Sequence, residues 1–152
     1  MKYFIFILGL LMVSCAGTTA TKKEPVPIRV TFSINKQELM KNLIAILTEE
    51  GFAISQANEA LGTITTEYRE LNEDEKFNNI LVKGIPVYGK VSISLLERPR
   101  NQIELIMTPI IKYTYMGEET ITKISEKHPF YKKCVTIISL LSQPISINPT
   151  PK

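Results

Sequence analysis

Few residues in this chain are of a type that could do chemistry: one histidine, His128, two cysteines, Cys15 and Cys134, and an acidic run from Glu70 to Glu75. A thiol beside an imidazole would suggest nucleophilic catalysis, and clustered carboxylates would suggest a calcium site. The sequence holds no Gly-x-Ser-x-Gly, no His-Glu-x-x-His and no glycine-rich phosphate loop. Each candidate is therefore judged by its own setting.

Neither chemistry is favoured by these settings. His128 and Cys134 are six residues apart in a segment expected to be helical, a spacing that does not bring side chains together. We expect His128 to be a surface residue at a helix start and Cys134, in KKCVTIISLL, to be a small buried residue. The run ELNEDEKF lacks the glycine and the spaced ligands of a calcium loop and predicts a solvated loop. We expect no metal, no cofactor and no enzymatic activity.

Cys15 follows an apolar run, Tyr3 to Val13, that is about half as long as the roughly 20 residues of a membrane-spanning helix. A basic Lys2, a short apolar run and then small residues are the order of a secretory signal peptide. The end of this run, Met12-Val13-Ser14-Cys15, resembles the lipobox of bacterial lipoproteins. That resemblance implies removal of residues 1–14 and a diacylglycerol on Cys15. The alternative is a soluble secreted protein with a free Cys15 thiol.

The lipid would hold the protein at a membrane surface, because acyl chains contribute about 0.8 kcal/mol per buried methylene. Residues 15–27 are small and polar with two prolines and predict a flexible tether. Ala16 follows the cysteine, and the same resemblance then implies the periplasmic face of the outer membrane. Once Cys15 carries lipid, Cys134 has no partner for an intramolecular disulfide.

The charge and length of residues 28–148 are those expected for a single domain without net charge. Basic and acidic residues are equal in number over residues 28–148, and the basic excess of the whole chain lies at Lys2, Lys22, Lys23 and Lys152. A nucleic-acid-binding protein needs a basic face, so no nucleic acid is expected as a partner. The length of 28–148 suits a single domain, with 149–152 as a tail.

The first two elements have clear signals. From residue 28 to 34, Ile, Val, Phe and Ile alternate with polar residues, which predicts a strand with one buried face. Asn35 is then the expected N-cap of a helix, with Glu38 in the position that completes a capping box. Gly51 is expected to end this helix in the left-handed conformation.

The remaining elements are mostly strands. Two short extended pieces flank residues 58–60, and longer strands are expected over 87–98 and 101–116. Pro109 must mark an edge, a bulge or a change of direction, because it cannot donate to a ladder. A final helix is expected to start at Pro129 and to stop before Pro144, although CVTIISLL would also suit a strand.

This order predicts an α+β fold, an antiparallel sheet with two helices packed on one face. The stretch from Val30 to Tyr68, with Gly51-Phe52 after the helix and Gly62-Thr63 on the next strand, resembles the opening of a BamC-like domain. That family implies a helix-grip fold in an outer-membrane lipoprotein that accompanies the barrel-assembly machinery.

Aromatic residues are the best candidates for binding a partner. Tyr113 and Tyr115 are two residues apart and would share one side of a strand, with Met116 next to them. If that side is free of helices they form an exposed stripe, and otherwise they are packing pairs. Tyr88, in the Gly-Pro loop of Gly84 to Gly89, could lie at the end of a groove between helix and sheet.

Two functions follow from these residues. The first is an envelope lipoprotein that serves as an accessory or scaffold subunit and binds another envelope protein. The second is a periplasmic carrier that holds an apolar ligand between helix and sheet. The predicted helix presents leucine, isoleucine and methionine to that space, and such side chains would fill it.

Overall fold

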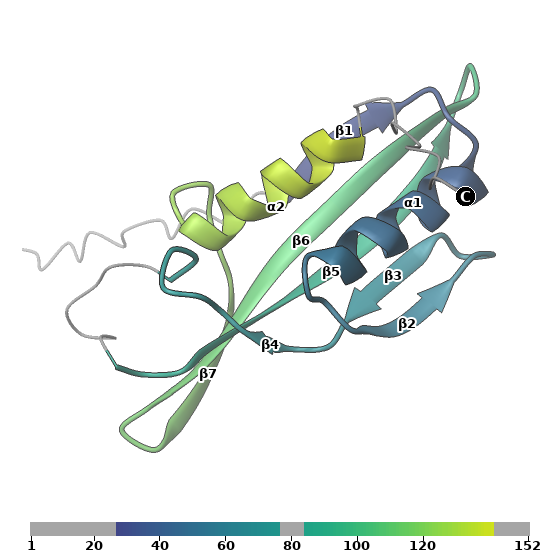
Figure 1. Ribbon diagram of the computed structural model, residues 1–152. Coiled ribbons are helices and arrows are strands. Elements are labelled where there is room, and N and C mark those ends of the chain that lie inside the picture. The colour runs from purple at the N-terminus through teal and green to yellow at the C-terminus, as the bar shows by residue number, and fades with distance from the viewer. Residues whose placement is uncertain (1–26, 77–83, 142–152) are drawn as a thin grey trace, which may run out of the picture.

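A computed structural model describes residues 27–76 and 84–141 of the 152-residue chain. The expected signal peptide 1–14, Cys15, the tether as far as residue 26 and the tail 149–152 lie outside the described residues. The elements, shown in Figure 1, are β1 (Ile28–Phe32), α1 (Lys36–Glu49), β2 (Ile54–Asn58), β3 (Thr63–Thr66), β4 (Arg69–Glu70), β5 (Val87–Arg98), β6 (Gln102–Tyr115), β7 (Glu118–Lys123) and α2 (Pro129–Leu141).

The strands form one antiparallel sheet around the long β5–β6 hairpin. Its order is β1-β6-β5-β3-β2, with β4 paired to β5 and β7 paired to β6. Strands β1 and β7 share one edge of β6, since β1 pairs with residues 103–107 and β7 with residues 110–115. Strand β2 forms the opposite edge of the sheet.

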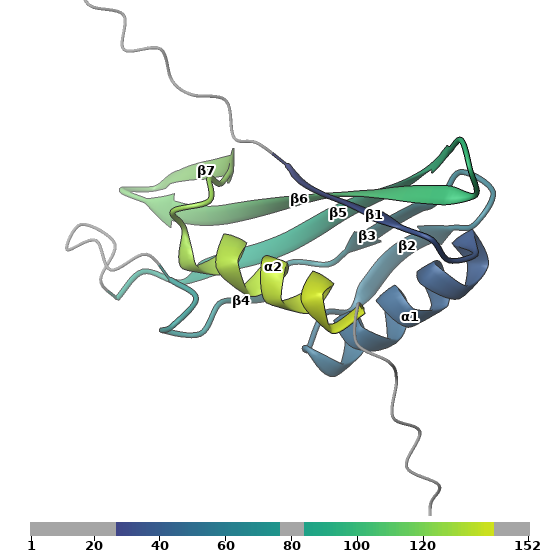
Figure 2. The same cartoon turned by 90° about the horizontal axis from the view of Figure 1, so that it is seen from above.

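Both helices lie on the same face of the sheet, as Figure 2 shows. The predicted α+β class, with an antiparallel sheet and two helices, is confirmed. The core between the two layers comes from alternate strand residues and from one side of each helix. Its most buried members include Leu39, Leu43 and Leu47 of α1, Phe130, Cys134 and Ile137 of α2, and Val91, Ile93, Leu105 and Met107 of the central hairpin.

The ends of α1 follow the sequence signals, except that the capping box is incomplete: among the described residues Glu38 makes no hydrogen bond to Asn35. The side chain of Asn35 accepts a hydrogen bond from the amide of Gln37 at 2.8 Å, which satisfies one of the free donors of the first turn. At the other end Gly51 has φ +80°, the amide of Gly51 donates to the Thr48 carbonyl and the amide of Phe52 donates to the Leu47 carbonyl. These two bonds form a Schellman motif, which places Phe52 against the core.

Pro109 lies inside β6, opposite Val91 of β5. The amide of Val91 donates to Thr66 Oγ1 at 3.0 Å and so points away from β6. The position opposite it then turns its own backbone groups away from β5 as well. On that outer side of β6, the pairing with β1 reaches only to Met107 and the pairing with β7 starts only at Ile110. No neighbouring strand therefore requires a donor from Pro109. The proline therefore occupies a local edge, one of the three predicted settings.

Between β3 and β4, the Thr66 hydroxyl group takes the place of a backbone carbonyl as the acceptor for the Val91 amide of β5. Thr66 is 2% exposed. Thr66→Val keeps the shape but removes the acceptor, so the buried amide of Val91 loses its partner. We expect the free energy of unfolding to fall by about 1–3 kcal/mol in urea denaturation followed by circular dichroism. Thr66→Ser, which keeps the hydroxyl, should retain most of this energy, and equal losses in the two variants would contradict the role of the bond.

The final helix is confirmed, and the strand alternative for CVTIISLL is wrong. α2 begins at Pro129, and Phe130, Cys134 and Ile137 are completely buried. Helical spacing places these residues on one side, where they pack on the sheet. The packing compensates for the β-branched residues of this helix, which lower its intrinsic helicity.

Three expectations differ from the structure. The first strand ends at Phe32, two residues earlier than predicted. Strand β7 was not predicted, because Met116-Gly117 is not a usual hairpin turn sequence. The prediction of a solvated loop over Glu70 to Glu75 holds for Glu70, Asn72, Glu73 and Asp74, which are exposed, but not for Leu71 and Glu75, which are 1% and 4% exposed. The reason is an ion pair with Arg69, described below.

Candidate functional site

The four residues predicted to bind a partner do not form one surface. Tyr113 lies opposite Val87 on the helix side of the sheet and packs against the core. Tyr115 follows it on the same side and is exposed, and Met116 lies in the turn to β7. Tyr88 lies opposite Lys112 and therefore faces the other side of the sheet. The proposed stripe of two exposed tyrosines is thus absent, because Tyr113 is a packing residue.

The tip of the β6–β7 hairpin, defined as Tyr115 and Met116, is apolar and exposed. Figure 1 shows the hairpin extending past the N-terminal end of α2. Met116 is 86% exposed and Tyr115 is 39% exposed. The turn residues Met116 and Gly117 have φ 51° and 85°, as a type I′ turn requires. A methionine with positive φ is unusual and costs stability.

This cost makes a prediction for Met116→Asn. Asparagine tolerates positive φ, and Asn-Gly is the preferred sequence of a type I′ turn. We expect the substitution to raise the free energy of unfolding by about 0.5–1 kcal/mol, measured by urea denaturation. Met116→Ala removes the same side chain without this preference and is expected to give no gain. A gain of equal size in both variants would show that strain at residue 116 is not the cause.

Tyr88 belongs to a cluster of lysines and tyrosines on the helix-free face. Lys112 Nζ lies 4.8 Å from the ring centre of Tyr68 and 5.9 Å from that of Tyr88. Lys90 Nζ lies 4.7 Å from the ring centre of Tyr68. These cation–π contacts occupy the tyrosine rings with side chains of the same sheet.

A surface hollow of about 310 Å³ lies between α1 and the edge strand β2. Met40 and Ile44, one helical turn apart on α1, supply its apolar wall. Ala57 of β2 supplies the opposite wall and is exposed. The remaining lining residues are polar: Gln37, Lys41 and Glu59.

The backbone direction of β2 follows from the hydrogen bond of Val91. The Val91 amide points towards β3, and so does the amide of Ile93, two residues further along β5. Ile64 lies opposite Ile93 and pairs with it. Because backbone direction alternates along a strand, Thr63 and Thr65 turn their amide and carbonyl groups towards β2.

Ala57 consequently turns its amide and carbonyl groups outward. Its neighbours Asn58 and Gln56 lie opposite Thr63 and Thr65 and are hydrogen-bonded to them. Ala57, between them, points in the other direction, along the free edge and beside the hollow. A bulge between Ile54 and Gln56 interrupts the ladder before this point. The free edge therefore offers one regular donor and acceptor pair, at Ala57.

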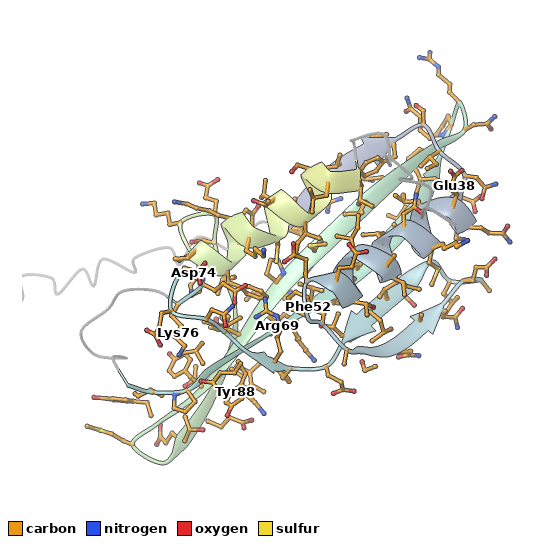
Figure 3. The ribbon with its side chains drawn as sticks, viewed as in Figure 1. Glu38, Phe52, Arg69, Asp74, Lys76 and Tyr88 are labelled. Atoms are coloured by element: carbon orange, nitrogen blue, oxygen red, sulfur yellow. The ribbon has the colours of Figure 1, made fainter. Side chains whose placement is uncertain are left out.

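A second polar site, which the sequence did not predict, joins Arg69 to Glu75. The two side chains form a bidentate ion pair with N–O distances of 2.6 and 2.8 Å. The amide of Asn72 donates to the same carboxylate at 3.0 Å. The Arg69 guanidinium lies 4.2 Å from the ring centre of Phe52, and Figure 3 shows these two side chains together. The pair attaches the segment from Glu70 to Glu75 to the core.

Electrostatics keep the Glu75 carboxyl ionised. Burial alone would raise the pKa of Glu75, but the hydrogen bonds from Arg69 and from the Asn72 amide outweigh burial and lower this pKa below its ordinary value. Arg69 Nε is buried and has no hydrogen-bond partner among the described residues. The arrangement is structural, with both carboxylate oxygens already bonded.

Cys134 and His128 have structural roles. Burial raises the pKa of the Cys134 thiol to about 12, so the thiol is protonated at neutral pH and unreactive, as expected for a buried residue. His128 lies at the start of α2 as predicted, but it is partly buried rather than at the open surface. Its Nδ1 accepts a hydrogen bond from the amide of Phe130 at 3.1 Å. The side chain therefore caps the helix.

This cap is expected to weaken in acid. Burial lowers the pKa of His128 below its ordinary value of 6.5, so the unfolded chain takes up the proton first as pH falls. The contribution of the cap is present above about pH 6.5 and is lost as pH falls through the folded-state value. Between pH 7.5 and 5, we expect the wild type to lose up to about 1 kcal/mol more than His128→Asn, which keeps an uncharged cap. Parallel pH profiles from urea denaturation would contradict this.

The described residues hold no group of three or more histidine, cysteine or acidic side chains that could bind a metal ion. Within the same residues, no helix is long and apolar enough to cross a membrane. The interior beneath α1 is filled by Leu39, Leu43 and Leu47, each at most 1% exposed. These side chains occupy the space in which a carrier would hold its ligand.

A scan against protein-family models finds no matching family, and a search of curated proteins finds no similar protein.

Proposed function

We propose that the chain is a membrane-anchored envelope lipoprotein that acts as a non-catalytic accessory or scaffold subunit. Lipid on Cys15 holds it at the periplasmic face of the outer membrane, and the folded domain binds another envelope protein. The lipobox-like sequence Met12-Val13-Ser14-Cys15 supports the anchor. The helix-grip arrangement and the relation to BamC-like domains belong to this proposal, supported by two helices on one face of an antiparallel sheet.

One observation carries the binding role, the free edge of β2 beside an apolar hollow. An extended segment of a partner adds to the sheet there, with its backbone bonded to the amide and carbonyl of Ala57. One side chain of that segment enters the hollow between Met40 and Ile44. Natural sheets protect such edges with charges, prolines or bulges; β2 has a bulge between Ile54 and Gln56, but the exposed residues Gln56 and Ala57 beyond the bulge are uncharged. The edge is therefore suited to pairing.

The partner is thus a protein with an exposed strand or a disordered segment, rather than a helix or a nucleic acid. Backbone bonds supply affinity in this mode, and the side chain in the hollow supplies specificity. Lys41 and Glu59 at the margins of the hollow carry opposite charges, which suits a partner segment without a strong charge of one sign.

The test is a crosslinking pull-down of the lipidated protein from its native membrane, comparing two substitutions at one position. Ala57→Pro removes the outward amide without disturbing the bonds to β3, whereas Ala57→Val keeps it and favours a strand. We expect wild type and Ala57→Val to recover the same envelope protein and Ala57→Pro to lose at least about tenfold of it, the equivalent of about 1.4 kcal/mol.

Three other results would contradict parts of the proposal. Equal recovery with Ala57→Pro, in a variant whose circular dichroism matches the wild type, would exclude strand addition at β2. An intact mass without added lipid on Cys15 would exclude the anchor. If no protein is enriched but a lipid or another small molecule copurifies, the scaffold role is wrong and the carrier role replaces it.

A further inference from the structure

We propose that the β6–β7 hairpin is a second membrane contact, with the tip residues Tyr115 and Met116 inserted into the interface of the bilayer that carries the lipid anchor. This inference rests on the anchor of the proposed function and deepens it, because it gives the domain a fixed orientation on the membrane. It is independent of the partner site at β2, which lies at the opposite edge of the sheet.

The chemistry of the tip suits a bilayer interface. Met116, 86% exposed, is the most exposed of the large apolar residues in the described part of the chain. Tyr115 has an apolar ring and a polar hydroxyl, the combination that is enriched where membrane and water meet. Ile121 of β7, 57% exposed, adds apolar surface on the other face of the same hairpin. An ordinary soluble turn would place asparagine where Met116 stands with φ 51°.

The direction of β1 brings this tip towards the anchor. β1 runs antiparallel to β6, and Ile28 lies opposite Met107 while Phe32 lies opposite Ile103. The N-terminal end of β1 therefore points towards the hairpin end of the sheet. From Met107 to Tyr115 is eight residues of β6, or about 27 Å at 3.4 Å per residue.

The length of chain before β1 is compatible with this contact. Twelve residues, 16–27, separate Cys15 from β1. Fully extended, twelve residues span at most about 43 Å, so the start of the domain stays within this distance of the lipid. The hairpin tip, directed towards the same side and about 27 Å further along the sheet, is then within reach of the bilayer.

Charges near the tip do not select anionic lipid. Lys112 and Lys123 are balanced by Glu118 and Glu119, and Lys112 pairs with Glu119 at 3.7 Å. Attraction to anionic headgroups therefore gives little, and apolar insertion is the driving force. The contact is expected in vesicles of zwitterionic lipid and at high salt.

Oxidation of Met116 by hydrogen peroxide measures this contact directly. The other methionines of the described residues, Met40 and Met107, are at most 5% exposed and react slowly. Leu61→Met provides a reference in the same chain, because Leu61 is exposed and lies far from the hairpin tip. Leu61 is 70% exposed in the turn between β2 and β3. In the same turn the Gly62 carbonyl accepts a hydrogen bond from the amide of Leu95, which lies near the end of β5 away from the hairpin. Peptide mapping by mass spectrometry gives both oxidation rates.

Two samples of the Leu61→Met variant are compared. One is the lipidated chain reconstituted into phosphatidylcholine vesicles, and the other is the chain made without residues 1–14, which carries no lipid and is kept in solution. We expect Met116 to oxidise roughly fivefold more slowly in vesicles than in solution, and the introduced methionine to keep its rate. Equal rates for Met116 in the two samples would overturn the inference.

The remaining outcomes separate the inference from the proposed function. A chain recovered without lipid on Cys15, as judged by intact mass, contradicts both. A lipidated chain whose Met116 is exposed in pure vesicles but protected in native membranes contradicts the bilayer contact and assigns the tip to a protein partner. Slower oxidation at both methionines would mean that access of peroxide to the whole protein has changed, and this also contradicts a specific contact at the tip.

Discussion

Glu75→Gln is expected to lower the free energy of unfolding by about 3 kcal/mol, because it leaves the Arg69 guanidinium charged, largely buried and without its counterion. Both members of the pair are enclosed, with side chains 16% exposed for Arg69 and 5% for Glu75. Urea denaturation at pH 7, followed by circular dichroism, measures the change. A loss below about 1 kcal/mol, the typical value for a surface ion pair, would contradict the structural role.

The double variant Arg69→Met, Glu75→Met is the control for this result. It removes both charges and keeps apolar bulk over Phe52, so no charge is left unpaired. We expect it to be more stable than Glu75→Gln alone, since replacing a buried pair with apolar residues is often close to neutral. The contribution of the pair in the wild type is present above about pH 4.5 and is lost as pH falls through the lowered pKa of Glu75.

Phe130→Ala is expected to cost about 3–5 kcal/mol, since Phe130 is completely buried and attaches the first turn of α2 to the sheet. Its ring lies over Gly89 of β5. A Cβ atom built on Gly89 would come within 2.8 Å of two atoms of this ring and within 2.5 Å of a methyl group of Leu71. Thermal and urea unfolding of Phe130→Ala would measure the loss.

Gly89→Ala tests the same contact from the other side. In the wild type the added methyl group overpacks the core and should cost about 1–3 kcal/mol. In the Phe130→Ala background, part of the clash is absent, so the same substitution should cost clearly less. The coupling between the two positions, obtained from the double-mutant cycle, should exceed about 0.5 kcal/mol. Additive effects would show that Phe130 does not exclude a side chain at residue 89.

These two predictions concern the same region, where α2, β4 and the segment from Glu70 to Glu75 meet. Phe52 and Phe130 lie 6.1 Å apart, centre to centre, and Arg69 lies over Phe52. The partner edge at β2 and the hairpin tip at Met116 lie outside this cluster. Core variants should therefore lower stability without changing the backbone chemistry of either surface, which separates loss of folding from loss of binding.

Local signals in the sequence were sufficient for most elements. The alternation in residues 28–32 and 87–95, the Asn35 cap and the Gly51 stop depend on residues close to one another in the chain, and the structure has them as predicted. The spacing of Phe130, Cys134 and Ile137 likewise defined the buried side of α2. Periodicity and capping are local properties, so one sequence is enough to recognise them.

Pairing between distant residues was not accessible in this way. Glu75 looks like one of several acidic residues in ELNEDEKF, and only the tertiary structure buries it against Arg69. The same holds for Tyr113 and Tyr88. The register of β5 and β6 places these two side chains on opposite sides of the sheet. A one-residue shift of one of these strands would have placed both tyrosines on the same side of the sheet.

The sequence by itself determined most of the elements and the α+β fold class, and it carries the proposed lipid anchor. It also placed Cys134 in the core and His128 at a helix start. Only the tertiary structure decided that β2 is a free edge and that Ala57 turns its backbone groups outward there. It also decided that Met116 projects from the end of the sheet towards which the N-terminal end of β1 is directed. The physical reason is that strand order and register arise from contacts between residues far apart in the chain, whereas helix caps, turns and alternation arise from neighbours.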